Sequence, residues 1–201
     1  KIKLDKPKEF KLKNGIRVLV VENHKLPRIN YSLRFDRKPI VEGEKTGVIS
    51  LLGSMLGNGT TNIPKDDFNE EVDFLGAGIN VGFGSGFAFT LTKNNEKVLD
   101  LFSDAVINPL LTEEEFEKEK DKLIEGLKSQ KKDIDAISGR VGDALSYGKS
   151  HAYGEFISEQ TIDNIKFEDI LDYHAKYFIP NNVYIVVIGD VNYKEVKSLI
   201  S

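Results

Sequence analysis

The sequence of 201 residues contains no cysteine and only three histidines. Without thiols there is no disulfide bond and no thiolate metal site, so histidine, aspartate and glutamate are the only strong ligands left for a transition metal. The histidines, His24, His151 and His174, have no second histidine or glutamate three or four positions away on a common apolar helix. Their spacing is typical of ordinary surface or core histidines.

The sequence also lacks a long apolar run and an excess of positive charge. No segment approaches the roughly 18 apolar residues of a membrane span, and residues 1–10 lack the apolar stretch of a secretory signal. The net charge is -4, and the lysines of residues 113–132 alternate with glutamates. A nucleic-acid partner is therefore not expected, because phosphate-binding domains usually carry a clustered basic excess. The cellular location stays open.

Hydrophobic periodicity predicts short strands mixed with longer helices. Strands are expected at 10–13, 16–21, 29–35, 79–83, 87–92 and 183–188, with turns at Asn14-Gly15 and Gly84-Ser85-Gly86. Helices are expected at 46–57, 64–76, 94–107, 113–132, 133–147 and 167–177. This order favours an α+β domain with a mixed, mainly antiparallel sheet covered by helices. Residues 191–201 have helical spacing without a stop signal, so we expect a single domain over residues 1–201, truncated at its C-terminal end.

Residues 76–86 are rich in glycine and superficially resemble a dinucleotide-binding fingerprint. A phosphate-binding loop must leave a strand and open a helix, whereas here a helix precedes the glycines and strands follow. The segment instead indicates a turn and a strand with little side-chain bulk, which another backbone can approach closely.

The helix predicted at 46–57 carries one stripe of small residues on an otherwise apolar cylinder. Ser50, Gly53, Ser54 and Gly57 follow each other at i, i+3, i+4 and i+7. Each glycine inside a helix costs about 1 kcal/mol relative to alanine. Close packing of a backbone or another helix on the stripe would compensate for that cost.

The same helix resembles the signature helix of the inverted-motif zinc metallopeptidases, the family of pitrilysin, insulinase and mitochondrial processing peptidase. In that family a Gly is followed by H-x-x-E-H, then by Met and by Gly-Thr, which correspond here to Gly47, Met55 and Gly59-Thr60. In this alignment, the two zinc-binding histidines of the family fall on Ser50 and Ser54. The family's general base, a glutamate, falls on Gly53. A serine hydroxyl is a weak zinc ligand, and glycine has no side chain.

The third zinc ligand of the family is a glutamate in a later helix, seven positions after the Glu of a Glu-Arg pair. The corresponding frame here is Asn108-Pro109 followed by Glu119-Lys120, and the position seven after Glu119 is Gly126. Glu125 is adjacent, but one step along a helix turns a side chain by about 100°. The resemblance therefore implies a member with no catalytic residues and no zinc of its own, and zinc is expected only in an active partner.

Further segments resemble the family in the same order along the chain. They are the strand-Asn-Gly-strand opening at 10–21, the Asn-bearing strand at 78–80, the loop at 151–154 and the closing segment at 177–190. The resemblance thus implies the processing-peptidase-like fold, also described as LuxS/MPP-like metallohydrolase. Such proteins are clamshells of two halves, each built of two related domains. We expect this chain to be the first domain of a non-catalytic half, followed by a second related domain in the full protein.

In the family, peptide substrate pairs as an added strand beside the segment that corresponds to Asn80, Val81, Gly82 and Phe83. The resemblance implies a catalytically inactive homologue that helps to enclose peptide or unfolded polypeptide. Its partner would be an active zinc peptidase half, in a separate subunit or in the same longer chain. Two alternatives stay open: a metal-dependent peptidase that uses Glu125 with His151 or His174, and a purely structural assembly domain. A plain core strand is likewise an alternative at 80–83.

Overall fold

The computed structural model describes residues 6–181 and 183–200. The chain divides into two compact units. Unit 1 comprises Lys1–Arg37, Leu56–Leu110 and Phe178–Ser201, and unit 2 comprises Lys38–Met55 and Leu111–Tyr177. In the described part of the chain, no helix combines the length and the apolar character that a membrane span requires.

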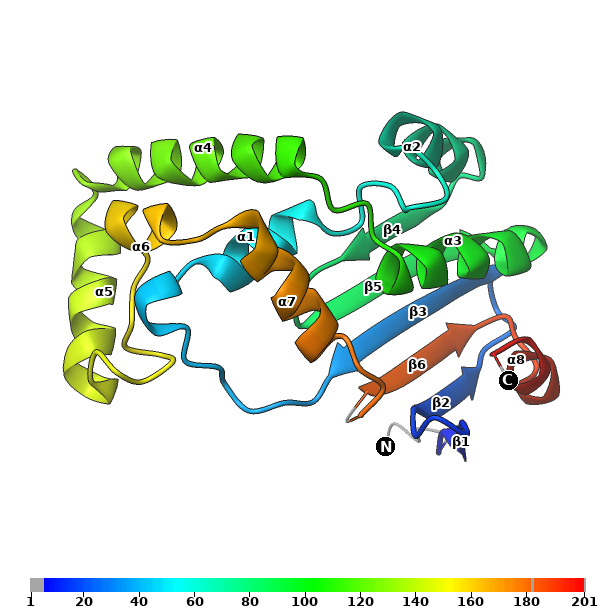
Figure 1. Cartoon of the computed structure of the whole chain (residues 1–201). Coiled ribbons are helices and arrows are strands. Elements are labelled where there is room, and N and C mark those ends of the chain that lie inside the picture. The colour runs from blue at the N-terminus through cyan, green and yellow to red at the C-terminus, as the bar shows by residue number, and fades with distance from the viewer. Residues whose placement is uncertain (1–5, 182, 201) are drawn as a thin grey trace. The chain divides into compact units, whose positions relative to one another are not determined.

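Unit 1 is built on a six-stranded sheet (Figure 1). Its strands are β1 (Lys8–Lys11), β2 (Arg17–Glu22), β3 (Arg28–Phe35), β4 (Gly78–Val81), β5 (Ser85–Leu91) and β6 (Val183–Gly189). The strand order is β1-β2-β6-β3-β5-β4, in which only the β2–β6 pair is parallel. The prediction of a mixed, mainly antiparallel sheet is therefore confirmed.

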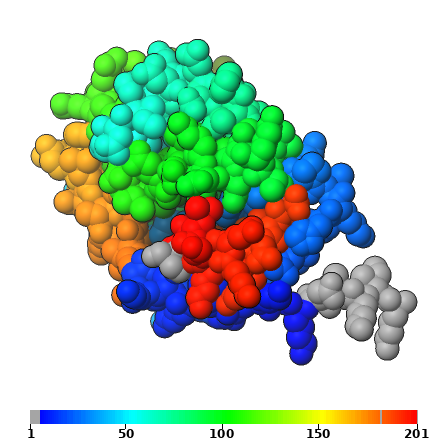
Figure 2. Space-filling model, turned by 90° about the vertical axis from the view of Figure 1, so that its right-hand side faces the viewer, coloured from blue at the N-terminus to red at the C-terminus, as the bar shows by residue number. Residues whose placement is uncertain are grey.

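The helices of unit 1 are α2 (Lys65–Phe74), α3 (Asn95–Ile107) and α8 (Tyr193–Ile200), and a 3-10 turn, η2 (Thr92–Asn94), precedes α3. Helix α3 lies along the sheet (Figure 1) and buries Phe102 against it. The hydroxyl of the buried Tyr31, on β3, donates to Asn95 Oδ1 at 2.5 Å and so anchors the start of α3. Residues of α3, of α8 and of the sheet line a common hollow. Figure 2 shows α8 at the surface.

Unit 2 is helical. It contains η1 (Gly43–Lys45), α1 (Val48–Met55), α4 (Glu113–Gln130), α5 (Ile134–Tyr147), α6 (Glu159–Asp163) and α7 (Phe167–Tyr177). Helix α1 packs against α4 and α7. Its buried, apolar face consists of Val48, Leu51, Leu52 and Met55. Helix α4 begins where predicted, because the side chain of Thr112 accepts the Glu115 N–H at 3.3 Å.

The structure corrects the turn between β4 and β5. Gly82 N donates to Ser85 O at 2.8 Å, so the turn lies at Gly82–Gly84 and not at the predicted residues 84–86. Gly86 is a strand residue instead, and its missing Cβ leaves room for the Phe102 ring, which lies 3.0 Å from that position. As a result, Gly82 and Phe83 are turn residues. Helix α6 was not predicted, because five residues are too few to display a helical period.

Candidate functional site

The positions that correspond to the zinc motif lie on one face of α1. Ser50 and Ser54 are exposed and Gly53 is half-buried, while the apolar residues of the helix point into unit 2. The predicted stripe is thus present as a surface feature of α1. Gly57, which follows the helix with a φ of 74°, is closely packed, because a Cβ there would lie 3.1 Å from Val81 N.

Two glutamates that the sequence analysis missed hold the N-terminus of α1. Glu42 Oε2 accepts the N–H groups of Gly47 at 3.1 Å and Ile49 at 2.8 Å. Glu155 in turn accepts the N–H of Glu42 at 2.8 Å and that of Gly43 at 2.9 Å. Burial raises the pKa of Glu42 above its ordinary value, and the N–H groups of α1 oppose that shift only in part. Glu155 directly follows the family-like loop at 151–154, so one structural role of that loop is to position Glu155.

Gly47 closes this arrangement sterically. Its φ is 117°, a left-handed conformation that favours glycine, and a Cβ there would lie 3.2 Å from Ile157 Cγ2. The first glycine of the family-like motif is therefore needed for the entry into α1. This use of Gly47 does not depend on a metal.

The fourth motif position, Gly126, lies on α4 in the same unit. Nothing lies within 4 Å of the position that a Cβ would take there. Earlier on the same helix, Glu119 forms an ion pair with Lys122 at 2.6 Å and is largely shielded from solvent. The adjacent Glu125 is exposed. The frame of α4 is therefore intact around a position that has no side chain.

The residues present do not fit a zinc ion. The hydroxyl of Ser54 donates to Leu51 O at 2.9 Å, within its own helix, and Gly53 and Gly126 supply no ligand atom. Across residues 6–181 and 183–200, no three His, Asp or Glu side chains are grouped so that they could hold a metal ion. Within those residues, the alternative ligand set of Glu125 with His151 or His174 is not assembled.

The remaining predicted site residues belong to β4, an edge strand of the sheet in unit 1. Asn80 pairs with Phe87 and Gly78 with Phe89 across β5. Because hydrogen-bonded pairs alternate along antiparallel strands and Gly82 bonds to Ser85, the N–H and C=O groups of Ile79 and Val81 point away from β5. Asn80 is exposed and Val81 is buried. Gly57 lies against the backbone of Val81, so the outward-directed groups of Ile79 are the part of this edge that can serve as a template for strand addition.

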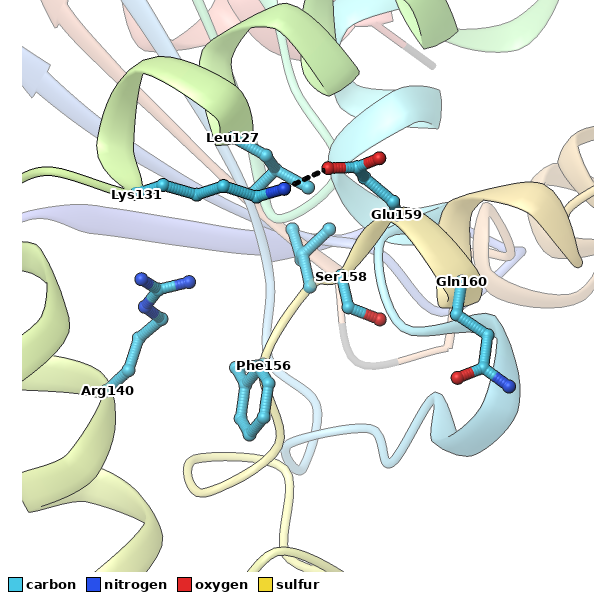
Figure 3. Close-up of a pocket in the computed structure, with 8 residues that line it drawn as sticks. Leu127, Lys131, Arg140, Phe156, Ser158, Glu159 and Gln160 are labelled. Carbon is cyan, nitrogen blue, oxygen red and sulfur yellow. Dashed lines mark hydrogen bonds and ion pairs between the residues drawn. The ribbon is translucent and has the colours of Figure 1, made fainter.

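Unit 2 also contains a hollow that the sequence analysis did not indicate (Figure 3). Lys131, directly after α4, forms an ion pair with Glu159 at 2.6 Å. Figure 3 shows this pair above Phe156, with Arg140 of α5 at the left below Lys131. Leu127 lines the hollow, but neither Gly126 nor α1 does. The hollow is therefore separate from the zinc-motif positions.

Comparison with known proteins gives the family. Residues 40–145, more than half of the chain, match the profile described as Insulinase (Peptidase family M16). The chain belongs to the insulinase family of peptidases. Residues 164–201 match a second profile, described as Peptidase M16 inactive domain.

Curated relatives align with nearly the whole chain. An uncharacterized zinc protease of Rickettsia felis is 24% identical over 94% of this chain and 47% of its own length. The zinc protease PqqE of Helicobacter pylori is 24% identical over 98% of this chain and 46% of its own length. The chain thus spans about half the length of the curated relatives it matches.

Solved structures show the same fold. A peptidase M16 inactive domain from Pseudomonas fluorescens superposes with a TM-score of 0.84 at 23% identity, over 96% of this chain and 48% of that chain. A protease from Helicobacter pylori gives a TM-score of 0.83 at 25% identity, over 98% of this chain and 49% of that chain. The prediction of a processing-peptidase-like fold is confirmed.

Proposed function

We propose that this chain is a catalytically inactive homologue of a zinc metalloendopeptidase and acts as a non-catalytic half that helps to hold peptide. The observation that carries the proposal is the exposed face of α1, where serine hydroxyls and a glycine stand at the positions of the family's ligands and base. The similarity of residues 164–201 to an inactive domain supports the same conclusion. An active half, in a separate subunit or in another part of a longer chain, supplies the zinc.

The edge of β4 is the proposed place of peptide contact. Main-chain pairing needs N–H and C=O groups that face outward, and Ile79 carries them, whereas Gly57 lies against the backbone of Val81. Asn80 lies next to Ile79 with its exposed side chain, while Gly82 and Phe83 contribute as the turn that ends the strand. A strand added here gains hydrogen bonds without displacing any strand of the sheet.

The first experiment measures metal and cleavage on the purified chain. We expect less than one zinc per ten chains by elemental analysis after dialysis, and no cleavage of an unstructured peptide. One tightly held zinc per chain, with peptide cleavage that EDTA abolishes, would overturn the inactive assignment.

The second experiment measures binding of a labelled, unstructured peptide by fluorescence anisotropy. Ile79→Pro removes an outward N–H without removing a hydrogen bond to β5, and Ile79→Ala controls for the lost side chain. We expect Ile79→Pro to weaken binding at least tenfold and Ile79→Ala to weaken it less than threefold. Equal binding by both variants and the unmodified chain, or no binding by any of them, favours the purely structural assembly role.

A further inference from the structure

One face of the strands β3, β4 and β5 is open, on the side opposite α3. Its outward-facing residues, called the open face below, are Arg28, Asn30, Ser32, Arg34, Gly78, Asn80, Ser85, Phe87, Phe89 and Leu91. Two phenylalanines stand out on it, because Phe87 and Phe89 are 43% and 45% exposed. Their ring centroids are 6.0 Å apart, so they form one continuous aromatic surface.

This aromatic surface reaches the edge of the sheet. The Phe89 ring lies over Gly78 on the neighbouring edge strand, and a Cβ at Gly78 would collide with the ring. Glycine at position 78 therefore does two things. It makes room for the ring, and it leaves no side chain between the ring and a strand added beside β4.

The open face is locally positive in a chain whose net charge is -4. Arg28 and Arg34 stand on β3, and none of the outward-facing residues is acidic. Within the described residues, neither guanidinium has a hydrogen-bond or ion-pair partner. Arg28 also lines a hollow together with Gly76 and Phe89, which extends from the chain entering β4 across to β3. Unpaired arginines beside exposed aromatic rings complement a segment that is both apolar and acidic.

On these grounds we propose that the open face is a side-chain subsite for an extended peptide strand bound along β4. The subsite is selective for an aromatic side chain with acidic residues two positions before and after it, because residues two apart in a strand point to the same face. The inference rests on the proposed function. A peptide residue that hydrogen-bonds to Ile79 lies between residues opposite Gly78 and Asn80, where side chains of the two strands approach most closely. The side chain opposite Gly78 meets the Phe89 ring, and acidic side chains two positions away point to the same face as Arg28 and Arg34.

Three labelled ten-residue peptides test this subsite by fluorescence anisotropy. Each peptide varies the central residue and the residues two positions before and after it, which point to the same face. The first carries Phe with glutamates, the second Ala with glutamates, and the third Phe with lysines. For the unmodified chain, we expect the first peptide to bind about 5–10-fold more tightly than the Ala peptide, because an aromatic pair contributes about that factor. We also expect it to bind more tightly than the lysine peptide, because glutamates complement the arginines and lysines repel them. Phe89→Ala should reduce the preference for the Phe peptide over the Ala peptide to less than twofold. The double variant Arg28→Gln, Arg34→Gln should reduce the preference for the glutamate peptide over the lysine peptide to less than twofold. Phe74→Ala, which removes a phenylalanine that is 84% exposed on α2, is the matched control and should change neither ratio.

The outcomes separate the subsite from the proposed function. If Phe89→Ala weakens all three peptides equally, or weakens none, the aromatic subsite is wrong while binding along β4 stands. If the arginine variant keeps the glutamate preference, the acidic flank is wrong. If Ile79→Pro binds all peptides as tightly as the unmodified chain, pairing along β4 itself fails. Circular dichroism of each variant confirms that the fold is retained.

Discussion

Arg37 donates a hydrogen bond to the main-chain oxygen of Phe83 and lies over the ring of the same residue, with its Cζ 4.0 Å from the ring centroid. The rings of Phe35 and Phe178 lie 4.8 and 6.0 Å from the same carbon. Because Phe83 is in the turn that ends β4, Arg37 ties this edge strand to the segment that follows β3. The aromatic rings shield the hydrogen bond from water, which makes it stronger than an exposed one.

Replacing Arg37 by leucine is expected to lower the free energy of unfolding by about 1–3 kcal/mol, through loss of a charged hydrogen bond and a cation–π contact. Arg37→Lys keeps the charge but not the planar group, so it should lose less. Urea denaturation measures both values. A leucine variant as stable as the unmodified chain would show that the turn does not need Arg37.

Glu42 makes the stability of the folded chain depend on pH, and the burial of its carboxyl group determines the sign of that dependence. Burial raises its pKa in the folded state above the ordinary value of 4.5, so the folded chain binds the proton more tightly than the unfolded chain. The resulting stabilisation is fully present below pH 4.5 and is lost as the pH rises through the folded-state pKa.

Glu42→Gln keeps an oxygen that accepts the N–H groups of α1 but removes the buried charge. We therefore expect its stability, relative to that of the unmodified chain, to increase between about pH 4.5 and pH 7. Glu42→Ala also removes the acceptor, so it should be about 1–2 kcal/mol less stable than Glu42→Gln at every pH in this range. Urea denaturation at several pH values checks both curves, and a difference for Glu42→Gln that stays flat or falls with pH would contradict the assignment.

The sequence was sufficient for the features whose signals are local. The strands, the long helices and the stripe of α1 follow from periods of two and 3.6 residues, and the family frame follows from motif order. The turn after β4 was misplaced because three glycines within five residues offer several equivalent turns, and only the close approach of Phe102 to Gly86 selects one.

Contacts between distant residues could not be predicted. Arg37 and Phe83 are 46 residues apart, and Glu42 and Glu155 are 113 residues apart, and no periodicity links such pairs. The close packing that was expected on the stripe of α1 is not found at Ser50 and Ser54, because both residues are exposed. Helix α1 ends at Met55, so Gly57 lies beyond the helix, where it packs against the backbone of Val81.

Two glycines of the motif region should respond oppositely to alanine. Gly126 is inside α4 with open space around it, so Gly126→Ala should stabilise the chain by about 0.5–1 kcal/mol. Gly47 has a φ of 117° and a close contact with Ile157, so Gly47→Ala should destabilise the chain by about 1–3 kcal/mol. Chemical denaturation measures both, and changes of the same sign would contradict the geometry described for these two sites.

Restoring the motif tests whether unit 2 retains the metal-binding geometry of the insulinase family. Ser50→His, Ser54→His and Gly126→Glu together replace three positions without ligating side chains by two imidazoles and a carboxylate, the ligand set of a catalytic zinc site. Ser50 and Ser54 are exposed and Gly126 has open space, so the new side chains can be accommodated. We expect this triple variant to hold about one zinc per chain after dialysis, as measured by elemental analysis.

Each control removes one part of the restored site. The double variant Ser50→His, Ser54→His lacks the ligand from α4 and should lose its zinc on dialysis, because two ligands hold zinc far more weakly than three. Adding Gly53→Glu to the triple variant supplies the general base but no ligand, so its zinc content should not change. If the triple variant holds no more zinc than the double variant, then α1 and α4 do not present these positions to a common point, and the loss of the site extends beyond its side chains to the arrangement of the two helices.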